Sequence, residues 1–259
     1  MHGPMTTAAL LLLLPLAAHA QDADRWSWTG AVPAGRSIEI KGVNGAVSAS
    51  LGSGSQVRVV AVKSAREDDP AAVELRVVEH AGGVTICAVY PSPRGRPAND
   101  CQPGAHGRSN VSRNDVKVDF TVELPRGTSL VARTVNGGVT GTGLQSDVTA
   151  HTVNGDVRVG TTGVARAETV NGSIHAALGR SDWRDELAFE TVNGGITVEF
   201  SGELNAVVQA NTVNGSIDTD YPLSVQGRFG PKRLTGTVGS GGRTLELSTV
   251  NGAISLVRR

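Results

Sequence analysis

The sequence predicts an all-β protein, a β-solenoid in which short coils stack like a single-stranded β-helix, with a less regular N-terminal β portion. Two observations support this fold. The tripeptide Val-Asn-Gly occurs seven times, and Thr precedes it in six copies. The residues on either side alternate between apolar and polar types, which is typical of half-buried strands in a repeat protein. The repeated Asn residues are Asn44, Asn136, Asn154, Asn171, Asn193, Asn214 and Asn251.

The stretch before each Asn is expected to form a strand with one buried face. Positions six and four residues before the Asn are apolar in all seven copies, and the position three before it is polar. In the copy around Asn171 these positions hold Ala165, Ala167 and Glu168. Because successive side chains of a strand point to opposite faces, the apolar set marks the inner face of each coil.

Asn-Gly is expected to form a corner after this strand, because both residues tolerate the left-handed backbone of a sharp turn. A second strand follows, with Val or Ile two residues after each Gly. An antiparallel meander or barrel is the alternative, since Asn-Gly between strands is also a hairpin signal. Stacked coils are favoured, because Thr and Asn repeated about 4.8 Å apart can form hydrogen-bonded ladders.

The alternation of side chains along the strand places the Asn, and the Thr two residues before it, on the inward face. The Val has the opposite parity, so it is either rotated inward at the corner or covered by a second layer.

The chain divides into three segments. Residues 1–20 resemble a cleaved export signal, with an apolar run from Ala8 to Ala18 and the small residues Ala18 and Ala20 at the cleavage point. Residues 21–130 form an N-terminal β portion with the first coil and a Cys-bearing loop, and residues 131–259 form the regular coils. We expect residues 21–259 to make one continuous body.

Two longer steps interrupt the repeat. The 92 residues between Asn44 and Asn136 contain four strand-like runs, at 56–62, 73–78, 83–89 and 116–124, and a loop at 91–114 that we expect to be mobile. The 37 residues before Asn251 are expected to hold two coils, with a degenerate corner at 237–239. Because a stacked sheet needs protected ends, we expect Trp26 and Trp28 to cover the first coil, and the two terminal Arg residues to discourage pairing at the last.

Composition and cysteine content agree with export. Lys plus Arg and Asp plus Glu are 24 each, so no excess of charge points to a nucleic-acid partner. No apolar segment near the C-terminus forms a transmembrane anchor. Cys87 and Cys101 are the only cysteines, and they bracket a loop rich in Pro and Gly. We expect a disulfide between them, formed in the periplasm or outside the cell. A reactive or metal-binding pair is the alternative.

Few residues indicate chemistry. Asp182, Trp183 and Arg184 form a charged and aromatic cluster on a loop between coils, which is a candidate recognition loop or simply a loop packed by its Trp. Glu168 and Glu190 occupy equivalent outward positions, as a pair of catalytic carboxylates would. The outward positions of His151 and His175 lack the further ligand that a metal site needs. We therefore expect no catalytic residue, no metal and no cofactor.

The Thr-Val-Asn-Gly corners, the Pro125-Arg126-Gly127 turn and the closing stretch from Gly239 to Gly252 resemble a bacterial putative-adhesin family. The resemblance covers roughly residues 33–259. It implies an exported or envelope-associated β-solenoid, and it implies no catalytic residue.

We therefore expect a non-enzymatic, exported β-solenoid that acts as an adhesin-like binding protein or scaffold of the cell envelope. Its partner would be an envelope protein or polysaccharide, and the sequence does not define the oligomeric state. Two alternatives remain open: a polysaccharide-processing enzyme, and an accessory protein in envelope-stress signalling, which rests on the family resemblance alone.

Overall fold

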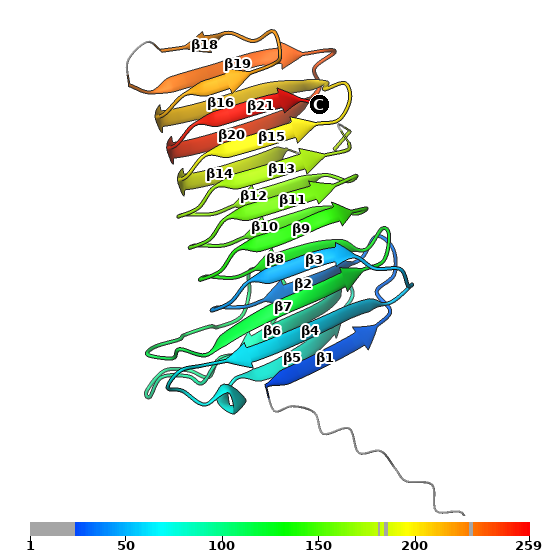
Figure 1. The fold of residues 1–259 in the computed structure, drawn as a ribbon, viewed down its shortest axis with the longest axis vertical. Coiled ribbons are helices and arrows are strands. Elements are labelled where there is room, and N and C mark those ends of the chain that lie inside the picture. The colour runs from blue at the N-terminus through cyan, green and yellow to red at the C-terminus, as the bar shows by residue number, and fades with distance from the viewer. Residues whose placement is uncertain (1–23, 181, 184–185, 228–229) are drawn as a thin grey trace, which may run out of the picture.

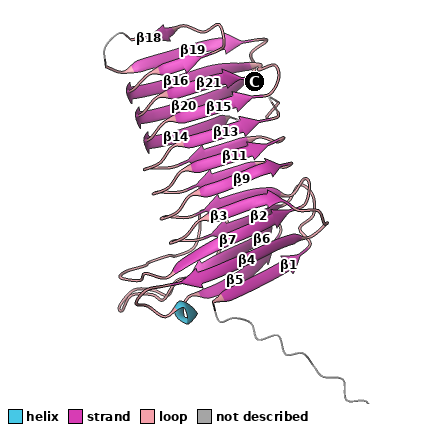
Figure 2. Cartoon of the chain, viewed as in Figure 1, coloured by secondary structure: helices cyan, strands magenta, loops and turns pink. Residues whose placement is uncertain are grey.

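The computed structural model describes residues 24–180, 182–183, 186–227 and 230–259, and it shows a β-solenoid made of two long sheets. The inner faces of the two sheets share one apolar core that runs the length of the elongated body (Figures 1 and 2). Within the described residues, the only helical element is a short 3-10 turn, η1 (Pro70–Ala72). The predicted fold class is confirmed. The expected export signal at 1–20 lies outside the described residues.

The first sheet has ten strands. In spatial order they are β1 (Arg25–Gly30), β4 (Val57–Ser64), β7 (Lys117–Leu124), β3 (Val47–Leu51), β9 (Val139–Leu144), β11 (Val157–Thr161), β13 (Ile174–Leu178), β15 (Ile196–Phe200), β21 (Ile254–Arg258) and β17 (Ile217–Thr219).

The second sheet has eleven strands. In spatial order they are β18 (Val225–Gln226), β19 (Lys232–Val238), β16 (Ala206–Asn214), β20 (Arg243–Asn251), β14 (Leu187–Asn193), β12 (Ala165–Glu168), β10 (Val148–His151), β8 (Ser129–Arg133), β2 (Ser37–Lys41), β6 (Gly83–Val89) and β5 (Glu74–His80).

Each Val-Asn-Gly corner carries the chain from the second sheet to the first. The strand before the corner and the strand after it pair in parallel with the equivalent strands of the neighbouring coils. The alternating pattern predicts the buried face correctly. In the coil around Asn171, for example, Ala165, Ala167 and Ile174 are buried, and Glu168 is exposed. The antiparallel meander is therefore wrong for the regular coils.

Antiparallel strands cap both sheets at the N-terminal end of the stack and the second sheet at its C-terminal end. At the N-terminal end, β6 and β7 make one further coil outside β2 and β3, and β5, β4 and β1 follow in antiparallel pairing. At the C-terminal end, β19 and β18 cover the outer edge of β16 in the same way. The four strand-like runs expected between Asn44 and Asn136 correspond to β4, β5, β6 and β7. Trp26 and Trp28 lie on β1, beyond β4 and β7, so they pack in this cap and do not cover the first coil directly.

The order of the coils in space differs from their order in the sequence. The C-terminal strands β20 and β21 lie between the coil of Asn193 and the coil of Asn214 (Figure 1). The expectation of two successive coils between Asn214 and Asn251 is therefore wrong, because that stretch forms the antiparallel cap and then returns into the stack. The two terminal Arg residues consequently do not protect an edge. Arg258 lies over the ring of Tyr221, and Arg259 pairs with Glu199.

The corners require Gly for a steric reason. Of the seven corner glycines only Gly45 has a positive φ, and the corner Asn residues have none, so the expected left-handed corner is wrong. A β-carbon on any of the other six would instead overlap the carbonyl oxygen of the Gly in the adjacent coil. Successive coils approach too closely at this point for any side chain.

Candidate binding surface

Six corner valines form a row of apolar side chains on one long edge of the solenoid. They are between 37% and 43% exposed, although the same position in the first corner, Val43, is only 9% exposed. Together with the corner Asn residues beside them they define what we call the Val–Asn edge: Val135, Val153, Val170, Val192, Val250 and Val213, in spatial order. No second layer covers them in the described part of the chain. The invariant Val is therefore exposed, which neither sequence interpretation anticipated.

The Asn side chains form a continuous hydrogen-bonded ladder along this edge. Each Nδ2 donates to the Oδ1 of the Asn in the neighbouring coil, and all six distances are 2.8 Å. At the N-terminal end, Asn44 donates instead to the carbonyl oxygens of Asn114 and Val116. Asn44 is half-buried and the other six side chains are exposed, so the expected inward position is wrong for Asn.

The six corner Thr residues are buried, and their hydroxyls join adjacent coils. Each hydroxyl does not bond to the next Thr, as a simple ladder would require. It donates to the carbonyl oxygen of the corner Gly in the adjacent coil, as Thr169 does to Gly155 at 3.0 Å and Thr191 does to Gly172 at 2.8 Å. The buried Thr hydroxyls and the exposed Asn amides thus bond adjacent coils on either side of each Val. They fix the spacing of the valines, and the edge is a rigid surface.

The Cys-bearing loop begins and ends beside the first corner of the stack, where Asn44 contacts Tyr90 and Asn114. Cys87 and Cys101 form the expected disulfide, with a Cα–Cα distance of 5.7 Å. Lys41 of β2 anchors the loop, because its Nζ donates to the carbonyl oxygens of Gln102, Gly104 and His106 at 2.8, 3.0 and 2.6 Å. Burial under the loop lowers the pKa of the Lys41 ammonium. These contacts tie residues 101–106 to the sheet, in contrast to the mobile loop expected from the sequence.

A buried carboxylate makes a second anchor for the same loop. Glu39 accepts hydrogen bonds from the Gly104 amide at 2.8 Å, from the Thr85 hydroxyl at 2.9 Å and from Nε of Arg133 at 3.0 Å. On the other side, Tyr90 donates to the carbonyl oxygen of Val116, and its burial raises the pKa of the phenol to about 12. The loop is therefore a fixed part of the surface.

A hollow opens where the loop meets the Val–Asn edge. Its volume is about 290 Å³, and its walls include Lys41, Asp100, His106, Arg108, Arg133 and Val135. Arg108 pairs with Asp100 at 3.5 Å, and Arg133 pairs with Glu39. The hollow thus joins a polar wall, contributed by the loop, to the first exposed valine of the row.

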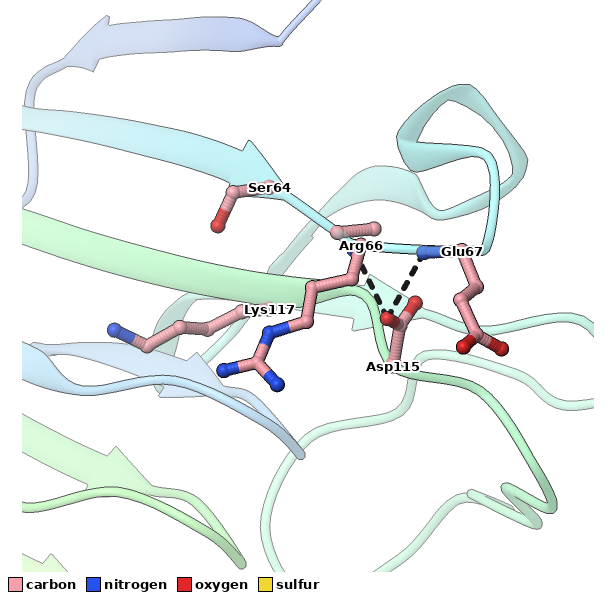
Figure 3. A pocket seen from close by; sticks show the side chains of 6 residues that line it. Ser64, Arg66, Glu67, Asp115 and Lys117 are labelled. Carbon is pink, nitrogen blue, oxygen red and sulfur yellow. Dashed lines mark hydrogen bonds between the residues drawn. The ribbon is translucent and has the colours of Figure 1, made fainter.

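A larger and more open hollow of about 530 Å³ lies at the N-terminal end, between Arg66, Asp115 and Lys117 (Figure 3). The Asp115 carboxylate accepts the backbone amides of Arg66, Glu67 and Asp68, at 2.9, 3.1 and 3.0 Å. These bonds, chiefly those from Asp68 and Arg66, lower the pKa of Asp115. The carboxylate therefore holds the turn together, and this arrangement is explained by the fold alone.

The outward acidic residues lie where the pattern predicts, but their contacts differ from those of a catalytic pair. Glu168 and Glu190 are register partners on β12 and β14, and both are exposed. Nδ1 of His151 lies 3.1 Å from a Glu168 oxygen. Further along the same face, burial and the negative charges of Glu186 and Glu190 raise the pKa of Glu246. Arg166 shares this face with Glu168, and within the described strands no aromatic residue lies on it to stack a sugar ring.

His151 and His175, which both occupy outward positions in the sequence pattern, do not lie on the same sheet. His151 lies on β10 in the second sheet, whereas His175 lies on β13 in the first sheet and is 3.4 Å from Glu199. Within the described residues, no group of three or more His, Cys, Asp or Glu side chains is placed to hold a metal ion.

The loop that follows β13 is held by its Trp. Trp183 is 2% exposed, lies 5.8 Å from the ring of Phe200, and donates its indole N–H to the carbonyl oxygen of Thr244. Asp182 is exposed and pairs with Arg180 at 2.7 Å. Arg184 lies outside the described residues. A recognition role for Asp182, Trp183 and Arg184 stays a prediction, and it cannot use the Trp face, which is buried.

The sequence reasoning missed the Val–Asn edge, although it contained a signal. An apolar residue that is retained at every corner, on the parity opposite to the core, is either covered or exposed for a purpose. The repeat alone does not separate these cases, because exposure depends on whether another segment packs on the corner. Among the residues that the structure describes, the valine of the first corner is buried and those of the other six corners are exposed.

The chain has structural relatives among solved proteins. The chain resembles the crystal structure of a putative cell adhesion protein from Clostridium sporogenes, with 12% identity over 91% of this chain and 100% of the other, and a TM-score of 0.44. It also resembles a putative adhesin from Bacteroides fragilis, with 12% identity over 91% of this chain and 97% of the other, and a TM-score of 0.37. No curated protein matches the chain.

No helix within the described residues is long and apolar enough to cross a membrane. The Toastrack DUF4097 family model matches residues 32–257, which include every Val-Asn-Gly corner and both caps apart from β1. On this match the chain belongs to the Toastrack DUF4097 family.

Proposed function

We propose that the protein is a non-enzymatic, exported binding protein or scaffold of the cell envelope, which holds an elongated partner along the Val–Asn edge. The observation that carries this proposal is the row of six exposed valines beside the Asn ladder. These side chains fill no core, yet the same residue stands at every corner. Contiguous exposed apolar rows on soluble domains mark interaction sites.

The chemistry of the edge defines the kind of partner. Valine methyl groups favour an apolar strip on the partner, and the rigid ladder leaves the remaining lone pairs of the Asn oxygens and one amide hydrogen per side chain for polar contacts. The coils repeat about every 4.8 Å, so a partner with a repeating, extended form gains one set of contacts per coil. An extended envelope polysaccharide or a protein segment meets this requirement. The hollow beside Val135 would receive the end of such a partner.

The test compares valines on the edge with valines elsewhere. Val153→Thr, Val170→Thr and Val192→Thr, combined in one protein, keep the β-branched shape and remove apolar surface along the edge. The matched control combines Val62→Thr, Val77→Thr and Val225→Thr, because these residues are equally exposed, at 41%, 36% and 40%, but lie outside the edge.

Immobilised protein is incubated with polysaccharides and with solubilised envelope proteins from the host, and retained material is measured. The proposal expects at least tenfold weaker retention by the edge variant and unchanged retention by the control. Equal retention by both variants would contradict it. Newly released sugar ends, lost in Glu168→Gln with Glu190→Gln, would instead support the polysaccharide-processing alternative.

A further inference from the structure

The C-terminal coil, residues 243–259, fills a slot that the rest of the chain leaves open. After β15 the chain skips one coil position, continues into β16 and β17 in the position beyond it, and then forms the cap strands β18 and β19. Only then does it return to place β20 between β14 and β16, and β21 between β15 and β17 (Figure 1). The slot therefore receives a segment that follows the cap strands in the chain.

The coils on both sides of the slot form the same ladder hydrogen bonds with the C-terminal coil as other neighbouring coils form with each other. Asn251 donates to Asn193 and accepts from Asn214, so its removal would interrupt the ladder on both sides. The backbone bonds follow the same rule, since Gly194 donates to the Asn251 carbonyl and Gly252 donates to the Asn214 carbonyl. Four apolar side chains of the coil are fully buried between the sheets: Leu245, Leu247, Ile254 and Leu256.

The connection from the cap to this coil is short. It is the loop between β19 and β20. This loop contains Gly239, Gly241 and Gly242, all with positive φ, and it is held through Ser240, whose amide donates to Oδ1 of Asn205 at 2.8 Å. Glycines in such a loop can extend as readily as they can fold back.

From these observations we propose that the C-terminal coil is exchangeable, so that residues 243–259 of one copy occupy the slot of a second copy and build a strand-exchanged homodimer. Every contact within the slot is the same whether the coil comes from its own chain or from another. The free energy of exchange then depends on the loop and on concentration, which is the condition under which domain swapping is favourable. The inference is independent of the Val–Asn edge, although a dimer would present two such edges.

The decisive experiment uses two full-length proteins, each with one added cysteine. Ala188 on β14 and Glu246 on β20 are register partners on the outer face of the second sheet. One protein carries Ala188→Cys and the other carries Glu246→Cys, so neither can form this new cross-link within its own chain. Neighbouring strands lie about 4.8 Å apart, within the Cα range of a disulfide. A mixed cross-linked dimer forms only if the coil of the second protein enters the slot of the first.

The two proteins are mixed, incubated in denaturant below the unfolding midpoint, returned to buffer and oxidised. The control replaces Ala188→Cys with Thr149→Cys, which lies on the same outer face but on β10, away from the slot. We expect at least fivefold more mixed dimer with Ala188→Cys than with the control. Equal amounts in the two mixtures would overturn the proposal.

A second measurement does not depend on added cysteines. Deletion of Gly241 and Gly242 shortens the loop, which should hinder closure of the coil on its own chain and raise the dimeric fraction measured by light scattering after chromatography. Insertion of two further glycines is the control and should leave the wild-type distribution. A shortened-loop protein that stays monomeric and folded would contradict the exchange.

Discussion

The side-chain amide of Asn251 lies 2.8 Å from the side-chain oxygen of Asn193, although 58 residues separate them in the chain. The equivalent contact between Asn171 and Asn154 spans 17 residues. The two contacts have the same geometry, so the ladder does not distinguish neighbours in sequence from neighbours in space. The loss of unfolding free energy caused by altering a coil should accordingly depend on where the coil lies in the stack and not on where it lies in the sequence.

The first prediction concerns the ladder itself. Asn171→Ala in a central coil removes one donated and one accepted hydrogen bond. Because the side chain is exposed and water replaces part of both bonds, we expect a loss of about 1 kcal/mol in the free energy of unfolding. Urea denaturation measures it. Asn214→Ala is the matched control, because Asn214 donates to Asn251 at the end of the ladder and should cost about half as much. Equal stability of Asn171→Ala and the wild type would show that the ladder contributes nothing.

The second prediction concerns the close approach of the corners. In Gly172→Ala, the new methyl group would overlap the carbonyl oxygen of Gly155, and the two coils would have to separate. We expect a loss of about 3 kcal/mol, in the upper range of overpacking. Gly160→Ala is the control, because its methyl group would lie 3.9 Å from the nearest atom, the backbone nitrogen of Gly143. A change in stability of less than about 0.5 kcal/mol in both variants would contradict the steric explanation of the corner Gly.

Much of this architecture could be predicted from the sequence, because one local pattern repeats. The alternation around each Asn predicts which residues, such as Ala167 and Ile174, enter the core, and it correctly favours stacked coils over a meander. The exposure of Val170 could not be predicted, since it depends on which segments cover a corner. The role of Gly172 was also misassigned, because φ is a local property whereas the contact with Gly155 belongs to the next coil.

The order of the coils could not be predicted for a related reason. Every Thr-Val-Asn-Gly coil presents the same hydrogen-bonding groups to its neighbours, so the coil of Asn251 fits either side of the coil of Asn214. The antiparallel cap decides between them. Thr212 and Asn211 of β16 pair with Lys232 and Arg233 of β19, which occupies the outer edge and leaves only the inner slot. Nothing in the repeat around Asn251 carries this information.

The third prediction concerns pH. Burial and the positive charge of Arg133 lower the pKa of His151 in the folded protein, whereas the Glu168 carboxylate acts in the opposite direction. The folded state therefore prefers the neutral imidazole. The resulting contribution to stability is fully present above the unfolded pKa of about 6.5, and it is lost as the pH falls through the lower folded pKa.

NMR titration of the His151 ring checks this directly, and we expect a midpoint below 6.5. Glu168→Gln removes the opposing negative charge, so the midpoint should fall further. Glu190→Gln is the control, since Glu190 lies on the next coil and is not among the causes of the shift. A midpoint that rises in Glu168→Gln would contradict the assignment of the 3.1 Å contact as a favourable pair.

The fourth prediction separates the two attachments of the Cys-bearing loop. The disulfide closes a segment of 14 residues, so its reduction should cost about 3 kcal/mol on the chain-entropy model. Lys41→Met keeps the disulfide and removes three hydrogen bonds to carbonyl oxygens of the loop. The first corner is held separately, because Asn44 bonds to Asn114 and Val116, so release of residues 102–106 should leave Val43 buried.

Hydrogen exchange distinguishes the outcomes. In Lys41→Met we expect faster exchange at Gly104, whose amide donates to Glu39, with little change at Gly172, whose amide donates to Asn193 in the central stack. In the reduced protein, faster exchange should extend to the amides of Arg108 and Asn110. These amides donate to the side chains of Asp100 and Asn99, which lie next to Cys101 in the chain. Unchanged exchange of the loop in both proteins would show that neither attachment holds it, and that packing against β2 and β6 is sufficient.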